Sequence, residues 1–205
     1  SGAQPLAEKQ ASVSRLIQIY SLRGHQIADL DPLGLQKRPM PIVMRLDQLG
    51  LSEADFDTEF YVGNFAGRTD VRMTLRELMS TLTRVYAGKV GGDYAHLSRG
   101  RERRWIRERL ERGMLSDPYS DDDRRHILRQ LTAAEGIERY LHTRYVGQKR
   151  FSLEGGDSLV PLLDDLIQQG GASGIQEMVL GMAHRGRINV LVNILGKAPQ
   201  ALFSE

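Results

Sequence analysis

The chain has 205 residues, of which 40% are hydrophobic and 26% charged, values close to those of an average globular protein. Its formal net charge of +2 is too small a bias to indicate nucleic acid or an anionic membrane as a partner. The absence of cysteine excludes disulfides, zinc–thiolate sites and catalytic thiols, and no apolar run is long enough to cross a bilayer.

The first predicted helix lies near the start of the chain. Apolar residues recur at helical spacing from Val13 to Leu22, which is typical of one buried helix face. Gly24 and the turn DPLG at 31–34 end this helix. Residues 35–70 contain prolines and several glycines, so we expect loop with short extended pieces there.

The second predicted helix has clear boundaries at both ends. Thr74 and Glu77 have the spacing of a capping box, in which each side chain accepts a hydrogen bond from the backbone N–H of the other residue. Gly88 closes the helix. The apolar stripe that predicts its buried face consists of Leu75, Leu78, Met79, Leu82, Val85 and Tyr86.

A third helix is predicted over about 101–112. Its expected inner face is formed by Trp105, Ile106 and Leu110. The arginines of this region are interleaved with glutamates, and Glu108 lies four residues before Arg112, a spacing that stabilises a helix. The pattern therefore favours a solvated amphipathic helix over a face that binds nucleic acid.

A fourth helix is predicted to begin near Ser120, because this serine or an adjacent aspartate can cap it. Its later turns are expected to point Ile137, Tyr140 and Leu141 inward. We therefore predict that residues 1–147 form a predominantly helical N-terminal region without internal repeats.

The pattern changes after the helical region. Asp157 or Ser158 can cap a leucine-rich helix, and a glycine-rich loop follows it. The run EMVLGM at 177–182 is short and continuously apolar, as expected of a strand buried on both faces. With another helix at about 188–195, the order of elements predicts that residues 148–205 begin an α/β domain with a parallel sheet.

The stretch AHRGR, residues 183–187, lies between the predicted strand and the last helix. In an open α/β sheet, ligands bind beyond the carboxyl ends of strands, where helix N-termini favour anions. Arg185 and Arg187 offer guanidinium groups for phosphate or carboxylate, and His184 can change protonation near neutral pH. Gly186 allows a ligand to approach the backbone closely. The residues alone thus predict an anion-binding site without a defined reaction; solvated loop residues are the alternative.

Several segments resemble, in the same order, the thiamine diphosphate-dependent 2-oxoglutarate dehydrogenase family. They are LIQIYSLRGHQIADLDPLGL (16–35), LTAAEGIERYL (131–141), KRFSLEGGDSLVPLL (149–163) and MVLGMAHRGRINVLVNILGK (178–197), with RRWIRERLE (103–111) more weakly similar. The resemblance runs from about residue 11 to the end of the chain. It implies an N-terminal fragment of the decarboxylating first component of the 2-oxoglutarate dehydrogenase complex, and an α/β domain of the thiamine diphosphate-binding type after the helical region.

The resemblance also implies an activity and site residues. The enzyme would decarboxylate 2-oxoglutarate on thiamine diphosphate with Mg²⁺, in the tricarboxylic acid cycle, and transfer the succinyl group to the lipoyl group of dihydrolipoyl succinyltransferase. His184 would lie in the active site and interact with the substrate, and Arg185 would contact thiamine diphosphate. Phe151 would lie near the cofactor or the substrate, whereas Arg187 and Asn189 would support the loop.

No metal ligand is predicted within the chain. GDS at 156–158 with Asn189 resembles the Gly-Asp-Gly and Asn-Asn pattern that holds Mg²⁺ in thiamine diphosphate enzymes. The third residue is a serine, however, and Val190 follows the asparagine, so the pattern is rejected. The resemblance implies that the Mg²⁺ ligands and other catalytic residues lie beyond residue 205.

Several expectations concern the whole protein. Family members are homodimers with active sites between subunits, so the chain alone is expected to be inactive. A cytoplasmic location is expected in a bacterium and the mitochondrial matrix in a eukaryote. Two alternatives remain open: a 2-oxoadipate dehydrogenase-type relative, which shares the His-Arg-Gly-Arg segment, and a non-catalytic helical assembly module.

Overall fold

The computed structural model describes residues 5–116, 119–147 and 150–203. The chain divides into two compact units, Ser1–Pro118 and Tyr119–Glu205, here called the N-terminal and C-terminal units. The structure thus groups residues 119–147 with the segment that follows them, whereas the sequence pattern changes at residue 148. The domain boundary drawn there stays a prediction. None of the described helices combines the length and apolarity that a membrane span requires.

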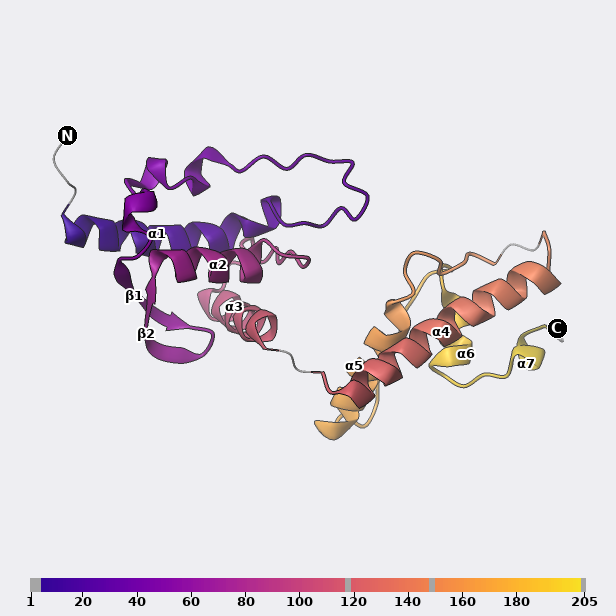
Figure 1. Ribbon diagram of the computed structural model, residues 1–205. Helices are drawn as coiled ribbons and strands as arrows, with labels where there is room; N and C mark the ends of the chain where they lie inside the picture. The colour runs from indigo at the N-terminus through magenta and orange to yellow at the C-terminus, as the bar shows by residue number, and fades with distance from the viewer. Residues whose placement is uncertain (1–4, 117–118, 148–149, 204–205) are drawn as a thin grey trace. The chain divides into compact units, whose positions relative to one another are not determined.

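The described part of the N-terminal unit contains α-helices and one hairpin (Figure 1). The elements are α1 (Leu6–Arg23), β1 (Glu59–Phe65), β2 (Arg68–Thr74), α2 (Leu75–Tyr86) and α3 (Gly100–Leu115). Short 3-10 turns lie at Gly24–Gln26, Ile42–Met44, Asp47–Leu49 and Glu53–Asp55. The 35–70 region is therefore mostly irregular, as expected, but its last residues form a complete strand.

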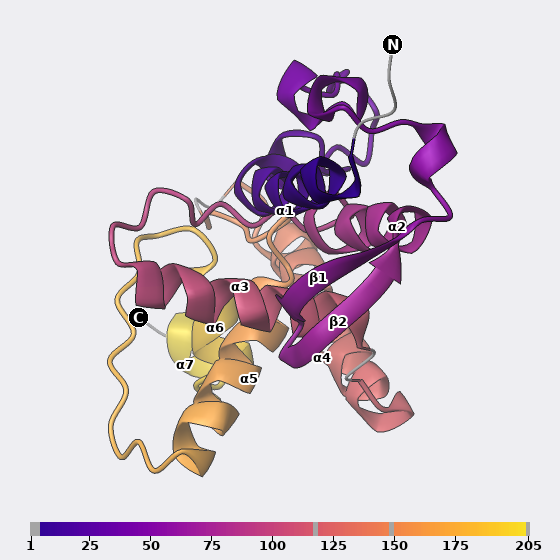
Figure 2. The ribbon, with the colours of Figure 1, turned by 90° about the vertical axis from the view of Figure 1, so that its left-hand side faces the viewer.

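The strands β1 and β2 pair antiparallel (Figure 2), and the register places Glu59 opposite Thr74. Ala66 and Gly67 connect them and both have positive φ, at 52° and 76°. Two consecutive residues with positive φ are typical of the tight hairpin turns whose twist matches that of the strands. This turn explains why the chain reverses at Ala66–Gly67.

The core of the N-terminal unit lies between α1, α2 and the hairpin. Its fully buried side chains include Val13, Leu16, Tyr20, Phe60, Leu75, Leu78, Leu82 and Val85. The predicted capping box is confirmed: Glu77 N–H donates to Thr74 Oγ1 at 3.3 Å, and Thr74 N–H donates to the Glu77 carboxylate at 2.9 Å. These hydrogen bonds hold the pKa of Glu77 below its usual value.

The C-terminal unit is built around one long helix. Its elements are α4 (Asp121–Arg144), α5 (Leu159–Ala172), α6 (Arg187–Asn193) and α7 (Pro199–Phe203). Ser120 caps α4 as predicted, since its hydroxyl accepts a hydrogen bond from Asp123 N–H at 3.2 Å. Both α5 and α6 pack on α4 around a small core of Ala134, Leu153 and Val160. His126 of α4 lies 2.8 Å from Asp164 of α5, a hydrogen bond that lowers the pKa of this carboxyl.

The predicted strand at 177–182 is not formed. These residues are irregular and exposed, and Val179 is 94% exposed. A buried strand needs hydrogen-bonded neighbours on both sides. Among the described residues of the C-terminal unit there is no strand at all, so this segment lacks such neighbours. The sheet that the structure contains is the antiparallel pair β1–β2.

Three further sequence predictions fail locally. Trp105 is 54% exposed instead of buried, and its ring is covered by the guanidinium of Arg109 at 3.4 Å. Tyr140 is also exposed instead of buried. Ser158 stands at the N-cap position of α5 but makes no capping hydrogen bond with its side chain. The carboxylate of Asp157 accepts instead from Gly155 N–H at 3.2 Å.

Candidate functional site

Two loop segments of the C-terminal unit lie against each other: residues 150–153, which precede α5, and residues 184–186, which precede α6. The rings of Phe151 and His184 are in contact, with centroids 4.1 Å apart and planes inclined at 45°. Gly186 N–H donates to Phe151 O at 2.9 Å. The structure thus brings together two of the residues that the sequence analysis singled out.

The guanidinium of Arg185 joins the same two segments. Its Nη1 donates to Ser152 O at 2.9 Å, while the side chain stays exposed. Its remaining N–H groups have no partner among the described residues. Arg185 is therefore fixed at one donor and free to bind an anion with the others.

Phe151 has an unusual backbone conformation. Its φ is +44°, in the left-handed region that a bulky side chain rarely adopts. Such a conformation costs on the order of 1–3 kcal/mol and persists only where the surroundings enforce it. Here the hydrogen bond from Gly186 and the contact with the His184 ring hold Phe151 at the surface, where the residue is 43% exposed.

Gly186 packs directly against the side chain of Leu153. A Cβ at this position would lie 2.6 Å from Leu153 Cδ1, and its φ is +73°. Close approach and left-handed backbone both require glycine here. The sequence analysis assigned this glycine to the approach of a ligand, whereas the structure shows it packed on Leu153, immediately before α6 begins.

A buried carboxylate on α4 forms hydrogen bonds with the segment before α5 and with α6. Glu138 of α4 is 3% exposed, and its Oε1 accepts from Leu153 N–H at 3.0 Å and from Asn189 Nδ2 at 3.1 Å. Asn189 also donates to Ala134 O at 2.9 Å. The network ties α4 to the segment before α5 and to α6.

Arg150 is a further member of this network and contacts Glu138. Its Nη1 donates to Glu138 O at 2.6 Å and lies 3.7 Å from the Glu138 carboxylate. Its Nη2 donates to His142 Nδ1 at 3.0 Å. The sequence analysis overlooked Glu138 and Arg150. A usable signal existed for Glu138, because it lies four residues after the buried Ala134 and three before the buried Leu141, on the inner face of the helix.

Arg187 and the N-terminus of α6 contribute less to an anion-binding site than the sequence analysis predicted. Arg187 is exposed, and its side chain has no partner among the described residues. The helix that it begins has only seven residues, too short to provide an anion site by its dipole alone. The cationic character of this surface therefore comes from its side chains.

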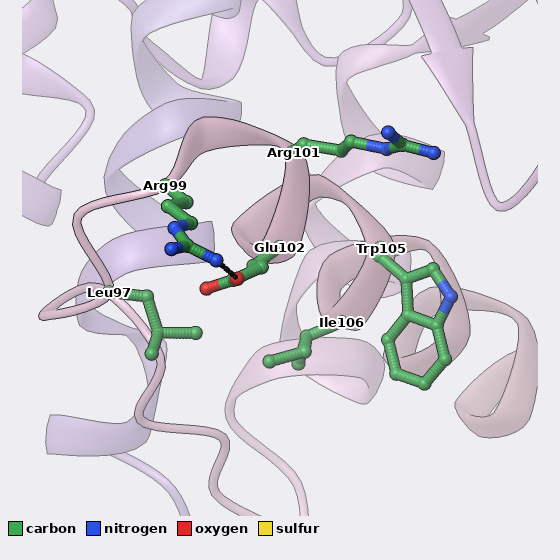
Figure 3. A pocket seen from close by; sticks show the side chains of 6 residues that line it. All are labelled: Leu97, Arg99, Arg101, Glu102, Trp105 and Ile106. Carbon is green, nitrogen blue, oxygen red and sulfur yellow. Dashed lines mark hydrogen bonds and ion pairs between the residues drawn. The ribbon is translucent and has the colours of Figure 1, made fainter.

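A cavity lies in the N-terminal unit, at the start of α3 (Figure 3). It has a volume of about 780 Å³, and Leu97, Trp105 and Ile106 contribute its apolar wall. An ion pair between Arg99 and Glu102, 3.1 Å long, stands at its side. None of the predicted site residues lines it.

The described residues contain no cluster of three or more His, Cys, Asp or Glu side chains placed to hold a metal ion. Asp31, in the motif RGHQIADLDPLG, acts as a turn residue, since its carboxylate accepts from Leu33 N–H and from Gln36 N–H. The second hydrogen bond is the main reason why the pKa of Asp31 is lowered.

Comparison with known proteins gives a consistent set of relatives, although no family model matches the chain. The chain is 46% identical to the 2-oxoglutarate dehydrogenase E1 component of Azotobacter vinelandii, over 99% of this chain and 22% of that protein. It is 46% identical to the corresponding component of Cupriavidus necator, over 100% of this chain and 22% of that protein. It is 43% identical to the 2-oxoglutarate dehydrogenase E1/E2 component of Corynebacterium glutamicum, over 97% of this chain and 16% of that protein. The chain thus spans about a fifth of the length of the relatives it matches.

Proposed function

We propose, from the premise that this chain belongs to the 2-oxoglutarate dehydrogenase E1 family, that it is part of an enzyme that decarboxylates 2-oxoglutarate. The observation that carries this proposal is the 43–46% identity across almost the whole chain to relatives that bear this name. The parent enzyme would pass the succinyl group to the lipoyl group of a succinyltransferase.

The cluster formed by Phe151, His184 and Arg185 is our candidate for this chain's share of the catalytic site. Thiamine diphosphate, when bound, supplies the nucleophile and the electron sink for decarboxylation of a 2-oxo acid. The residues fit one side of such a site, because Arg185 keeps free N–H donors for a diphosphate oxygen. His184 is exposed beside it and can donate a hydrogen bond to a substrate carboxylate.

Phe151 and Glu138 have supporting roles in this proposal. The Phe151 ring contacts the imidazole ring of His184 on one side. The substrate would approach the imidazole from the opposite side. Glu138 fixes the backbone at Leu153 and the side chain of Asn189, which keeps the two segments together. Mg²⁺ and the rest of the cofactor would be held by residues outside this chain.

Other features of the whole protein are part of the same proposal. The exposed apolar segment 177–182 would become a strand of a parallel α/β sheet when the remaining sheet is present, since its side chains suit burial on both faces. The active enzyme would be a homodimer located in the cytoplasm of a bacterium.

The test is a decarboxylation assay on the full-length protein with an artificial electron acceptor. We expect turnover of 2-oxoglutarate that depends on added thiamine diphosphate and Mg²⁺. A clear preference for 2-oxoadipate would assign the alternative substrate. Absence of turnover with either 2-oxo acid would contradict the proposal and favour a non-catalytic assembly role.

A further inference from the structure

One face of α3 carries a stripe of arginines that the proposed function does not use. Arg103, Arg104 and Arg107 follow Gly100 at spacings of three, four and seven residues, which places all four positions on one side of a helix. They line a second cavity of about 330 Å³, whose wall also includes Gln18 and Ser21 of α1 and Tyr94. This cavity and the larger cavity in Figure 3 have no lining residue in common.

Of the three arginines that line this cavity, only Arg107 has an ion pair among the described residues. Arg107 Nε lies 3.5 Å from the buried carboxylate of Glu111. That carboxylate also accepts hydrogen bonds from the Tyr86 hydroxyl and, at 2.8 Å, from Ala66 N–H. Within the described part of the chain, the side chains of Arg103 and Arg104 have neither an ion pair nor a hydrogen bond. Two guanidinium groups at the cavity are thus available for an anion.

The Tyr94 hydroxyl and Arg107 Nε lie behind the cavity wall. Tyr94 is 5% exposed, and neither its hydroxyl oxygen nor Arg107 Nε is reached by solvent. Burial raises the pKa of Tyr94 to about 12, so its hydroxyl stays protonated. An anion in the cavity would therefore meet the guanidinium groups of Arg103 and Arg104 and not these two buried atoms.

We propose that this cavity binds a small oxyanion with at least two negative charges, of the phosphate or dicarboxylate type. The unpaired polar groups that line it are donors, which suits an acceptor-only ligand and disfavours a cation. Arg103 and Arg104 would pair with the anion through charge-assisted hydrogen bonds. The site belongs to the N-terminal unit and involves none of Phe151, His184 and Arg185.

Isothermal titration of the 205-residue chain tests this proposal. Sodium phosphate and sodium succinate are titrated separately at an ionic strength kept constant with sodium chloride, because screening weakens non-specific charge attraction. We expect saturable binding of at least one of them with a millimolar or lower Kd. Arg103→Gln and Arg104→Gln should each weaken that binding by about five-fold or more.

The matched control is Arg101→Gln, which removes an equal charge from the same helix at a position outside the cavity. This variant should leave the Kd within two-fold of the wild-type value. Tighter binding of phosphate or of succinate would assign the source of the oxyanion. Lack of saturable binding by both anions would overturn the proposal, as would equal weakening by Arg101→Gln and Arg104→Gln. Neither Arg103 nor Arg104 is buried, so replacement by glutamine is expected to leave the fold intact, which circular dichroism checks.

Discussion

Gly186 shows how single residues shape the candidate site. Its left-handed backbone brings the chain close to Leu153, and its N–H holds the carbonyl of Phe151. A side chain at this position would push the 184–186 segment away from residues 150–153. The contact between the rings of Phe151 and His184 therefore depends on a glycine that itself has no chemical role.

We predict that Gly186→Ala destabilises the C-terminal unit. The left-handed conformation alone costs an alanine about 1–2 kcal/mol, and overlap with Leu153 adds to this. The expected loss in the free energy of unfolding is therefore roughly 2 kcal/mol or more, measured by urea denaturation followed by circular dichroism.

Gly136 provides the control for this prediction. It lies in the middle of α4, and a Cβ there would meet no atom within 4 Å. Gly136→Ala should raise the free energy of unfolding by about 0.5–1 kcal/mol, because alanine is the better helix former. Equal stabilities of Gly186→Ala and the wild type would contradict our description of the loop.

The candidate site was only partly predictable from the sequence. The motif AHRGR and the family resemblance named His184, Arg185 and Phe151, but no spacing rule indicates that Phe151 and His184 touch. That contact is created by tertiary packing between two loops. The position of Glu138 on the inner face of α4 was readable from the sequence, but its hydrogen-bond partners were not, because they lie in distant parts of the chain.

At the scale of elements, α2 is specified locally. Its capping box, its apolar stripe and its end were all readable from the sequence, because each depends on residues within a few positions of one another. The stripe includes Leu78 and Leu82, which are fully buried against α1 and the hairpin. Local signals and tertiary packing agree in this helix.

We predict that Thr74→Ala lowers the free energy of unfolding of the N-terminal unit by about 1 kcal/mol. The substitution removes the side-chain acceptor for Glu77 N–H and breaks the capping box. Thermal or urea denaturation measures the change. Ser80→Ala, at an exposed position in the same helix, should leave stability unchanged or raise it slightly. A similar loss in both variants would argue against a specific role of the cap.

The elements that depend on distant partners were predicted less well. The segment 177–182 has the composition of a buried strand, but strand formation requires neighbours that the described C-terminal unit does not contain. The hairpin was expected only as short extended pieces, because its burial comes from packing against α1 and α2. Trp105 fits the apolar pattern of α3 and is nevertheless exposed.

At the scale of the whole molecule, the chain corresponds to 22% of the length of its relatives from Azotobacter vinelandii and Cupriavidus necator. We predict that the chain alone binds thiamine diphosphate with a Kd above the micromolar range, because Arg185 and the residues around it form only one side of the proposed site. Isothermal titration with thiamine diphosphate and Mg²⁺ measures this, with the full-length protein as the positive control. Micromolar or tighter binding by the chain alone would show that the site is more complete than we propose.

The most direct test of the proposed site is the rate of 2-oxoglutarate decarboxylation by full-length His184→Ala. We predict a loss in kcat/KM on the order of 100-fold or more, the size typical of a group that moves a proton or binds the reacting carboxylate. His126→Gln, which replaces another histidine of the C-terminal unit, should stay within two-fold of the wild type while both variants keep the wild-type circular dichroism spectrum. A His184→Ala enzyme with unchanged kcat/KM would contradict the assignment of this surface to the active site.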